Sequence, residues 1–393
     1  TWGRRFIRDG RQAHDAPQHD KRADSDHAPR LRAWLVLLIS LFMFSAAQYD
    51  NWIWGWGIQW YLVPAAAAGS FLAITRWKKS WSGLAVAAAL AAVAAYTFGA
   101  GVPVWIVGAI GIVALWRPAA RYLAMWLALA GVSIGLYLYG LPASQQLGYA
   151  VGHPLVVLDY ALVYIGSWGR GPAYAVAFLA LRGVHWLQPN PQLVRFGATF
   201  PSLPPSLAAL LAVLPATVGV LGLALVALVH LELARQKYRY LADWLPSLLL
   251  VYFSLLCALL TAFGRANFGV QEALASRYLT LSSLFWVGLL VPLSHLWRDF
   301  AAGRHTKKRR LRLFAATGAT IFAALYLSTY AGGLVGLRQR NLGLRQAAVA
   351  LRHLNASSDA ELSVLYPDPR FVRQEAAVMQ ALRLGPYASL SGR

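Results

Sequence analysis

The sequence has few charged residues, a single cysteine and none of the common nucleotide-binding or metal-binding motifs. Charged side chains make up only 13% of its 393 residues, hydrophobic ones make up 58%, and the mean hydropathy is +0.48. Soluble globular domains carry roughly 25% charged residues, so this composition excludes that class. The lone Cys257 lies in an apolar run, cannot form an internal disulfide, and is typical of a small core residue.

The missing motifs argue against several kinds of membrane protein. The chain has no P-loop, dinucleotide fingerprint, metalloprotease helix motif or nucleophile elbow. It is therefore not expected to be an ATP-driven pump or an intramembrane metalloprotease. No internal repeat supports an inverted-repeat transporter. The histidines and aspartates of residues 1–32 match no closed zinc site, and the sequence assigns neither a metal nor a cofactor.

Apolar blocks occupy most of the chain. Most are long enough to cross about 30 Å of hydrocarbon as a helix. They are rich in Leu, Ala, Gly and Val and show no strict alternation, which favours helices over barrel strands. The long blocks are Ala33–Tyr49, Trp60–Ile74, Arg121–Tyr139, Ser206–Leu233, Ala242–Phe263, Tyr278–Trp297 and Leu313–Tyr330, and Ser82–Phe98 and Pro103–Trp116 form a shorter pair.

The net charge of +21 comes from basic clusters beside these blocks. That placement follows the positive-inside rule and argues against nucleic acid as a partner. With a cytoplasmic N-terminal tail, the clusters near residues 76, 117, 235 and 304 all fall inside, provided that residues 154–186 cross twice or form a re-entrant hairpin. We therefore predict an all-α polytopic transmembrane helical bundle of about eleven spans in a bacterial inner membrane. Its N-terminus is expected in the cytoplasm and its C-terminus outside.

Three regions differ in composition. Residues 1–32 are basic and poor in large apolar side chains, as expected for a cytoplasmic tail or linker. The chain begins with Thr1 rather than Met, which is consistent with truncation. Residues 33–331 are predicted to form the transmembrane helical domain. Residues 332–393 are predicted to be a short extracytoplasmic helical tail, with an amphipathic helix over Leu334–Leu354 and a short helix over Arg370–Leu384.

The most informative polar stretch runs from Gly264 to Tyr278, between two long apolar blocks. Arg265 and Arg277 lie at its two ends, and both fall outside in the predicted topology, where basic residues are scarce. The planar guanidinium suits phosphate oxygens, so the pair predicts binding of a diphosphate or lipid phosphate, assisted by Asn267, Glu272 and Tyr278. The alternative is that the arginines reach lipid head groups or that an Arg–Glu pair fixes the loop.

A second stretch, from Gln48 to Tyr61, follows the first apolar block and is rich in tryptophan. One interpretation is an aromatic belt at the membrane interface. The other is a surface for sugars or lipids, in which Trp56 and Trp60 stack on sugar faces while Asp50, Asn51 and Gln59 bind hydroxyls. Because Gln59 is polar within an apolar run, we expect it to face the protein interior.

Asp159 is a carboxylate in an otherwise apolar segment, which makes it a candidate functional residue. It is expected either to form an ion pair with His153 or Arg170, or to take part in catalysis.

The stretches Tyr49–Trp60 and Gly264–Tyr278 resemble a group of poorly characterised bacterial polytopic membrane proteins. These are compared with GT-C membrane glycosyltransferases, which use polyprenyl-phosphate sugar donors. The resemblance implies that Arg265 and Arg277 bind the leaving phosphate. It also implies an acidic catalytic residue in the first outside loop, where Asp50 is the only acid; Asp159 or an acid upstream of Thr1 are the other candidates.

The resulting hypothesis is an integral membrane protein that transfers a sugar from a polyprenyl-phosphate-linked donor to a glycan or lipid acceptor at the outer face of the membrane. The protein is expected to contact membrane lipid, and nucleic acid is not expected as a partner. The alternatives are an O-antigen polymerase or ligase, a transporter or flippase of a lipid-linked saccharide, and a non-catalytic membrane subunit.

Overall fold

The computed structural model describes residues 33–116, 118–140, 146–174, 205–302, 308–363, 365–366 and 368–392. The chain divides into two compact units, residues 1–43 and 44–393, and a helix over residues 33–43 is the described part of the first. Three sequence predictions lie outside the described residues: the tail 1–32, the second half of region 154–186, and the side chains of the basic cluster 304–312.

Every regular element in the described residues is a helix, and seven helices are long and apolar enough to cross a membrane. All seven long blocks predicted from the sequence are therefore confirmed as helices. The count of eleven spans stays a prediction, because three further apolar helices are only 10–17 residues long. The seven are Ala33–Ile53, Gly55–Arg76, Ala120–Leu138, Leu211–Arg235, Leu241–Phe268, Ser276–Arg298 and Thr320–Arg352, and the shorter ones are Trp81–Thr97, Gly99–Leu115 and Pro154–Ile165.

Helices α3 (Gln59–Arg76) and α4 (Trp81–Thr97) form a tight hairpin. The buried side of α4 is made almost entirely of alanine, which lets the two helices approach closely. The Ser70 hydroxyl donates a hydrogen bond across the pair to the carbonyl of Ala87 at 2.9 Å. Ser80 caps α4 by accepting from the backbone N–H of Gly83 at 3.3 Å.

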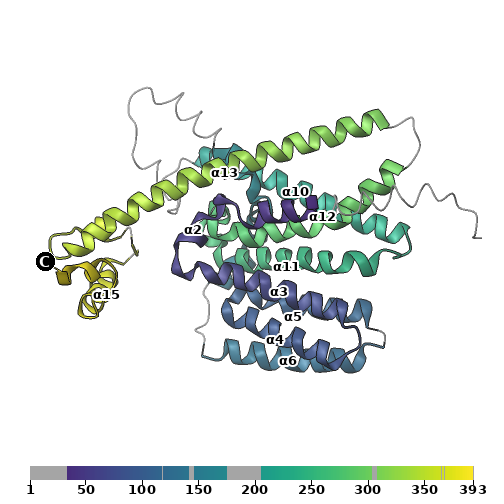
Figure 1. Ribbon diagram of the computed structural model, residues 1–393, viewed down its shortest axis with the longest axis horizontal. Coiled ribbons are helices and arrows are strands. Elements are labelled where there is room, and N and C mark those ends of the chain that lie inside the picture. The colour runs from purple at the N-terminus through teal and green to yellow at the C-terminus, as the bar shows by residue number, and fades with distance from the viewer. Residues whose placement is uncertain are drawn as a thin grey trace, which may run out of the picture. The chain divides into compact units, whose positions relative to one another are not determined.

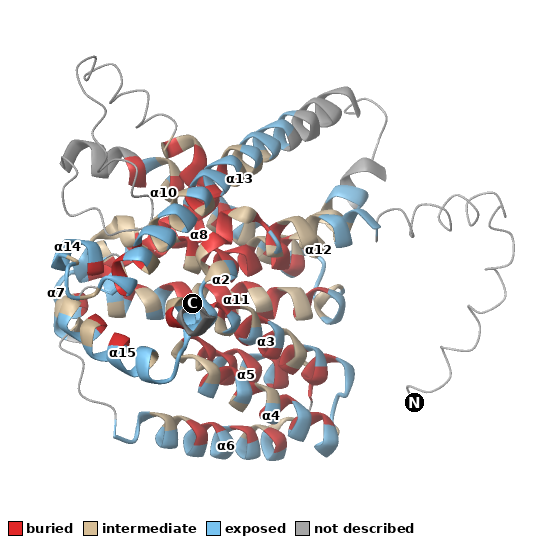
Figure 2. Ribbon diagram, turned by 60° about the vertical axis from the view of Figure 1, so that its left-hand side comes forward, coloured by how far each residue is buried: buried red, intermediate tan, exposed pale blue. Residues whose placement is uncertain are grey.

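Helices α5 (Pro103–Leu115) and α6 (Ala120–Leu138) extend this group (Figure 1). Trp126 of α6 donates to the carbonyl of Trp105 at 2.7 Å, and its ring packs into the space left by Gly108. The opposite side of α6 is exposed and apolar (Figure 2), as expected for a helix that faces lipid.

The centre of the bundle is α11 (Leu241–Arg265), which lies between α3 and α12 (Leu279–Ala302) (Figure 1). It also packs against α5 and α8 (Pro154–Ile165). Helix α10 (Pro205–Arg235) covers α8, and a Cβ on Gly166 would lie only 1.8 Å from the carbonyl oxygen of Pro215. Figure 2 shows that buried residues concentrate on these inner helices.

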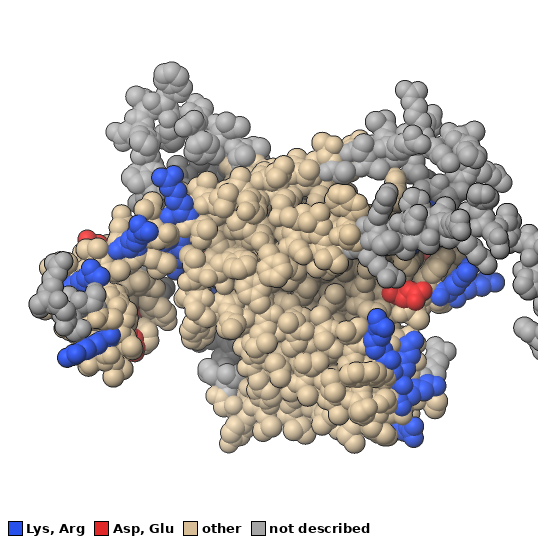
Figure 3. Space-filling view, in the orientation of Figure 1, with Lys and Arg blue, Asp and Glu red and all other residues tan. Residues whose placement is uncertain are grey.

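The bundle has two chemically different ends. At one, here called the basic end, the Tyr122 hydroxyl donates to the carbonyl of Lys79, Arg121 lies over Trp81, and Trp244 donates to His295. At the other, the motif end, lie the starts of α3 and α12 and the end of α11. Figure 3 shows a broad face free of described Lys, Arg, Asp and Glu side chains, with basic residues gathered at its two sides.

The irregular segment after α8 is buried rather than exposed to lipid. Its 3-10 turn η4 (Ser167–Gly169) is held by hydroxyl groups of α12 and α13. Ser167 donates to the hydroxyl of Ser282 at 3.0 Å, and Thr329 donates to the carbonyl of Trp168 at 2.8 Å. Irregular backbone at membrane depth requires such partners, because lipid supplies none.

Helix α13 (Lys308–Arg352) is continuous over 45 residues, so the apolar block and the amphipathic segment predicted after it form one helix. It ends at the polar stretch expected to stop it, and α14 (Asp359–Leu362), α15 (Pro369–Ala381) and the 3-10 helix η10 (Gly385–Gly392) pack around its end. A small apolar core holds this C-terminal module together: Ala350, Leu351, Leu362, Val372, Ala376 and Tyr387.

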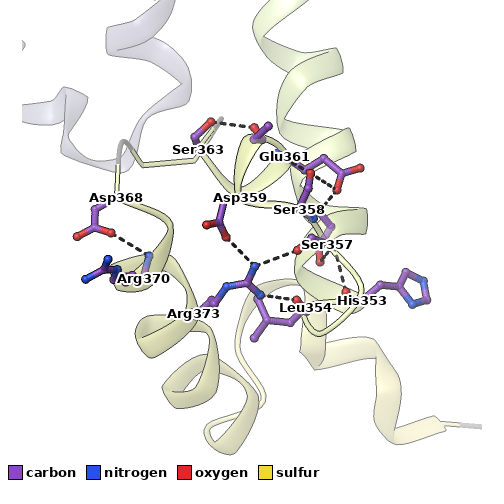
Figure 4. A network of polar contacts seen from close by, with 12 residues as sticks. His353, Leu354, Ser357, Ser358, Asp359, Glu361, Ser363, Asp368, Arg370 and Arg373 are labelled. Atoms are coloured by element: carbon purple, nitrogen blue, oxygen red, sulfur yellow. Dashed lines mark hydrogen bonds and ion pairs between the residues drawn. The ribbon is translucent and has the colours of Figure 1, made fainter.

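The C-terminal module is also tied by hydrogen bonds (Figure 4). Arg373 donates to the carbonyls of Leu354 at 2.7 Å and Ser357 at 2.9 Å, and it pairs with Asp359 at 2.9 Å. The Tyr387 hydroxyl donates to the carbonyl of Leu351 at 2.6 Å. These bonds fix α14 and α15 against the end of α13.

Candidate functional site

The two stretches that the sequence singled out meet at the motif end of the bundle. The short helix α2 (Tyr49–Ile53) carries Asp50, and the 3-10 turn η8 (Ser276–Tyr278) carries Arg277. The Ser276 hydroxyl donates to Oδ2 of Asp50 and accepts from the Asp50 backbone N–H at 3.4 Å. These residues are 226 positions apart in the chain. Their contact therefore depends on the packing of the helices.

A buried amide continues this junction. Nδ2 of Asn51 donates to the carbonyl of Arg277 at 3.0 Å and to the hydroxyl of Thr280 at 2.9 Å. The Thr280 hydroxyl in turn donates to Oε1 of Gln48. Gln48 and Thr280 are fully buried and Asn51 is 5% exposed. The chain of bonds fixes the backbone of Arg277 against α2. We use the name motif junction for Gln48, Asp50, Asn51, Glu272, Ser276, Arg277 and Thr280.

Arg277 forms an ion pair with Glu272 in the same loop, as one of the sequence interpretations proposed. Only its Nη2 group has hydrogen-bond partners among the described residues: the Glu272 carboxylate and, at 3.5 Å, the Tyr278 hydroxyl. The Nε and Nη1 donors of this half-buried guanidinium bond to no described residue. That edge of the fork remains available to an anion.

Aromatic rings surround the inner side of the junction. Tyr278 is 4% exposed, and its ring centroid lies 5.6 Å from that of Trp60 and 5.5 Å from that of Tyr164. Trp60 also packs on Phe98, with centroids 4.9 Å apart. Trp60 and Tyr278 are therefore core residues that support the junction.

Arg170 is a residue whose role at this site the sequence reasoning missed. It follows η4, is 5% exposed, and donates to the carbonyls of Ala47 and, at 3.1 Å, Leu274. One guanidinium thus joins both motif stretches to the irregular segment. The only sequence signal was an arginine within a Gly-rich break of an apolar region. The ion pair with Asp159 that the sequence suggested for Arg170 or His153 does not form, because Arg170 has these partners and His153 hydrogen-bonds to the carbonyl of Tyr149.

The remaining residues predicted for this site lie around the junction without bonding to it among the described residues. Arg265 is exposed and lies over the ring of Phe268, at 5.6 Å from its centroid. Asn267 is exposed, and Trp56 is 73% exposed. Gln59 is the first residue of α3 and is half-buried. The joint binding of a phosphate by Arg265 and Arg277 stays a prediction.

Asp159 is separate from the junction as well. It lies on α8 in a groove against α10, and no hydrogen bond or ion pair joins it to another described residue. The neighbouring Tyr160 is fully buried. Asp159 therefore lies on a different face of α8 from the one that packs against the core.

The motif end carries further positive charge on α13. Gly333 and Gly336 bring α13 against Ala47 and Tyr49, so the part of α13 beyond residue 336 continues from this end. That part contains Arg338, Arg340, Arg345 and Arg352, of which all but Arg340 are exposed. The location of Arg265 and Arg277 at this end is therefore not enough by itself to distinguish them from other arginines as phosphate-binding residues. The Nε and Nη1 donors of Arg277, which bond to no described residue, are the more specific indication of an anion site.

The chemical groups of the junction are a carboxylate, a guanidinium and several hydroxyls. Within the described part of the chain, no group of three or more His, Cys, Asp or Glu side chains could hold a metal ion. Oδ2 of Asp50 accepts from Ser276, and Oδ1 bonds to no described residue. Asp50 can therefore accept a hydrogen bond from a ligand hydroxyl while Arg277 binds an anionic group.

Comparison of the chain with protein-family models, curated proteins and solved structures gave no match. The resemblance to GT-C glycosyltransferases therefore rests on the two motif stretches alone.

Proposed function

We propose that this chain is an integral membrane glycosyltransferase-like protein that transfers a sugar from a polyprenyl-phosphate donor to a glycan or lipid acceptor at the motif end of the bundle. The observation that supports it is the contact between α2 and η8. This contact brings Asp50 and Arg277 into one hydrogen-bonded junction, each with a side-chain atom that bonds to no described residue.

In the proposed reaction, the Nε and Nη1 edge of Arg277 binds the donor phosphate. The bond between the sugar anomeric carbon and the phosphate oxygen breaks, and the electron pair stays on the polyprenyl phosphate. A fixed guanidinium stabilises the charge that grows on this leaving group. The acceptor hydroxyl attacks the anomeric carbon and gives its proton to Asp50. Ser276 positions the carboxylate through its other oxygen.

The surroundings of the junction suit substrates with long apolar chains. Exposed apolar side chains on the outer helices offer a surface along which a polyprenyl chain can enter laterally. Trp52, Trp54 and Trp56 are each more than half exposed beside the junction and would hold the acceptor. In this proposal the basic end faces the cytoplasm of a bacterial cell, the motif end faces outward, and about eleven spans complete the bundle.

The proposal is tested with the purified full chain in liposomes containing radiolabelled polyprenyl-phosphate hexoses, by following transfer of the label. Arg277→Ala is expected to lower the rate by about 10²–10³-fold, the usual effect of removing one donor to a developing anion. Asp50→Asn is expected to lower it by about 10²–10⁴-fold. Arg338→Ala is the matched control, because Arg338 is an exposed arginine on α13 at the same end and bonds to no described residue.

Each variant is first checked for an unchanged elution volume in size-exclusion chromatography. Full transfer activity in a folded Arg277→Ala protein would refute the phosphate-binding role. If the wild-type chain moves labelled lipid across the bilayer but transfers no sugar, the flippase alternative replaces the transferase. If neither activity occurs, a non-catalytic subunit is the remaining interpretation.

A further inference from the structure

A groove between α8 and α10 lies apart from the motif junction. Its volume is about 450 Å³, which is within the range of ligand sites. It is lined by Asp159, Ala212, Val213, Ala216, Thr217 and Val220. The side chains that α10 contributes are small and mostly apolar, and Asp159 is the only charged residue among the described residues of the lining.

The carboxylate of Asp159 is half-buried and has no partner among the described residues. The nearby Thr217 hydroxyl already donates to the carbonyl of Val213 at 2.8 Å. A charged side chain on the apolar flank of a membrane bundle is unfavourable unless an opposite charge or a hydrogen-bond donor reaches it. Among the described residues that line the groove there is no lysine or arginine, so a partner for the carboxylate would come from beyond this set.

The groove lies toward the motif end of the bundle. Helix α8 begins at Pro154, beside α7 (Gln146–Gly152), and α7 contacts the turn η6 (Ala266–Phe268) at the motif end. Asp159 is five residues into α8, about 8 Å along its axis. The far end of α8 reaches deeper, where the Ile165 carbonyl accepts from Ser282 and Trp286 of α12. Asp159 thus lies near the motif end, with the more deeply buried part of α8 beyond it.

We propose that this groove binds a membrane lipid with an ammonium head group, such as phosphatidylethanolamine. The ammonium group donates to the Asp159 carboxylate, and one acyl chain lies along Val213 and Val220 of α10, which are more than half exposed. Charge complementarity selects the head group, and the apolar wall selects a lipid over a soluble amine. This site is independent of sugar transfer.

The first test uses the wild-type full chain in nanodiscs that contain equal amounts of phosphatidylethanolamine and phosphatidylglycerol. Native mass spectrometry after release from the disc counts the lipids that remain bound. Retention of phosphatidylethanolamine in clear excess is expected. Equal retention of both lipids, or an excess of phosphatidylglycerol, would overturn the proposal without recourse to any variant.

Two variants then locate the lipid. Asp159→Asn removes the charge and keeps the shape, and it is expected to lower phosphatidylethanolamine retention by about tenfold, as for loss of one charge-assisted hydrogen bond. Ala216→Leu fills the groove, leaves Asp159 in place and is expected to lower retention as well. Asp243→Asn is the control, because Asp243 is an exposed carboxylate in the first turn of α11 at the basic end.

Thermal unfolding in detergent identifies any variant that has lost its fold. Unchanged retention in folded Asp159→Asn means that no ammonium–carboxylate contact exists. Unchanged retention in folded Ala216→Leu means that the lipid binds elsewhere. Either result contradicts the proposed site, whereas loss in both with retention in Asp243→Asn supports it.

Discussion

The buried amide of Asn51 makes two hydrogen bonds to the region that begins α12, and one of the two acceptors, the hydroxyl of Thr280, is fully buried. Removing the amide leaves the buried Thr280 hydroxyl and the carbonyl of Arg277 without this donor. Leaving a buried polar group unsatisfied costs about 1–3 kcal/mol. Asn51 is therefore more important for stability than its place in an aromatic-rich stretch suggests.

We expect Asn51→Ala to destabilise the folded protein by about 1–3 kcal/mol. Thermal unfolding in detergent, followed by tryptophan fluorescence, measures the change. Asn267→Ala removes the same amide from an exposed position in the neighbouring loop and is expected to leave the midpoint unchanged. Equal midpoints for the two variants would show that the bonds of Asn51 contribute nothing to the free energy of unfolding.

Glu361 gives a pH dependence at the residue scale. It completes a capping box at the start of α14: its carboxylate accepts from the backbone N–H of Ser358 at 2.8 Å and from the Ser358 hydroxyl at 2.9 Å. The backbone bond, and then the side-chain bond, lower the pKa of this carboxyl below its ordinary value. Because the folded-state pKa is depressed, the stabilisation is complete above about pH 4.3, the ordinary glutamate value, and is lost as the pH falls through the folded-state pKa.

We therefore expect the amides of α14 to lose hydrogen-exchange protection as the pH falls below about 4.3, after correction for the intrinsic rate. Glu361→Gln keeps an acceptor but cannot titrate, so its protection should not show this step. A wild-type protein whose protection is constant down to pH 3 would contradict the assignment of the cap. The carboxyl is exposed, so the effect is confined to this helix.

At the scale of whole elements, small residues decide how closely helices approach. A Cβ on Gly333 of α13 would lie 2.5 Å from Cα of Ala47, whereas the neighbouring Gly332 has no atom within 4 Å of such a Cβ. The two glycines differ only in the side of the helix that they occupy. Gly333 is required for packing, whereas Gly332 only contributes the low helix propensity of glycine.

This contrast predicts opposite effects for one substitution at adjacent positions. Gly333→Ala is expected to destabilise the protein by about 1–3 kcal/mol, because the added methyl overpacks the contact with the turn η1 (Ala46–Gln48). Gly332→Ala is expected to stabilise it by up to about 1 kcal/mol through helix propensity. Thermal unfolding of both variants checks the prediction, and equal shifts for the two would argue against the close approach of α13 to η1.

The same scale explains the irregular segment after α8. The structure places the backbone of residues 165–171 against the hydroxyls of Ser282 in α12 and Thr329 in α13. The Ser282, Ser283 and Thr329 side chains supply partners that lipid cannot. The sequence shows these hydroxyl residues within apolar spans, but it does not show that they bond to the irregular segment after α8.

For the whole molecule, the distribution of basic residues predicts its orientation in the membrane. The basic end carries the clusters beside Arg76 and Arg235, and positive residues are retained on the cytoplasmic side. Lys78 is exposed at this end, and Asn267 is exposed at the motif end. Cys257 is fully buried, so the wild-type chain gives an unreactive background.

In intact bacterial cells, a membrane-impermeant maleimide is expected to label Asn267→Cys and to label Lys78→Cys only after permeabilisation. The wild-type chain should remain unlabelled in both states. The reverse pattern would place the motif end in the cytoplasm. It would also exclude a reaction at the outer face of the membrane.

The sequence by itself determined the seven long apolar helices, the polar loop between α11 and α12, and the aromatic stretch before α3. These features follow from local composition: length and hydropathy decide where a helix can cross a membrane. The sequence also proposed an Arg–Glu pair that fixes this loop, and the structure shows that Arg277 and Glu272 form it.

The tertiary structure decided which polar residues meet. Asp50 and Ser276 are 226 positions apart, and Arg170 reaches Ala47 and Leu274 from a third segment. Local patterns carry no information about such partners, because these contacts depend on how α3, α8, α11 and α12 pack. The same packing separates Asp159 from the motif junction, since the side of α8 that carries it turns toward α10 rather than toward the core.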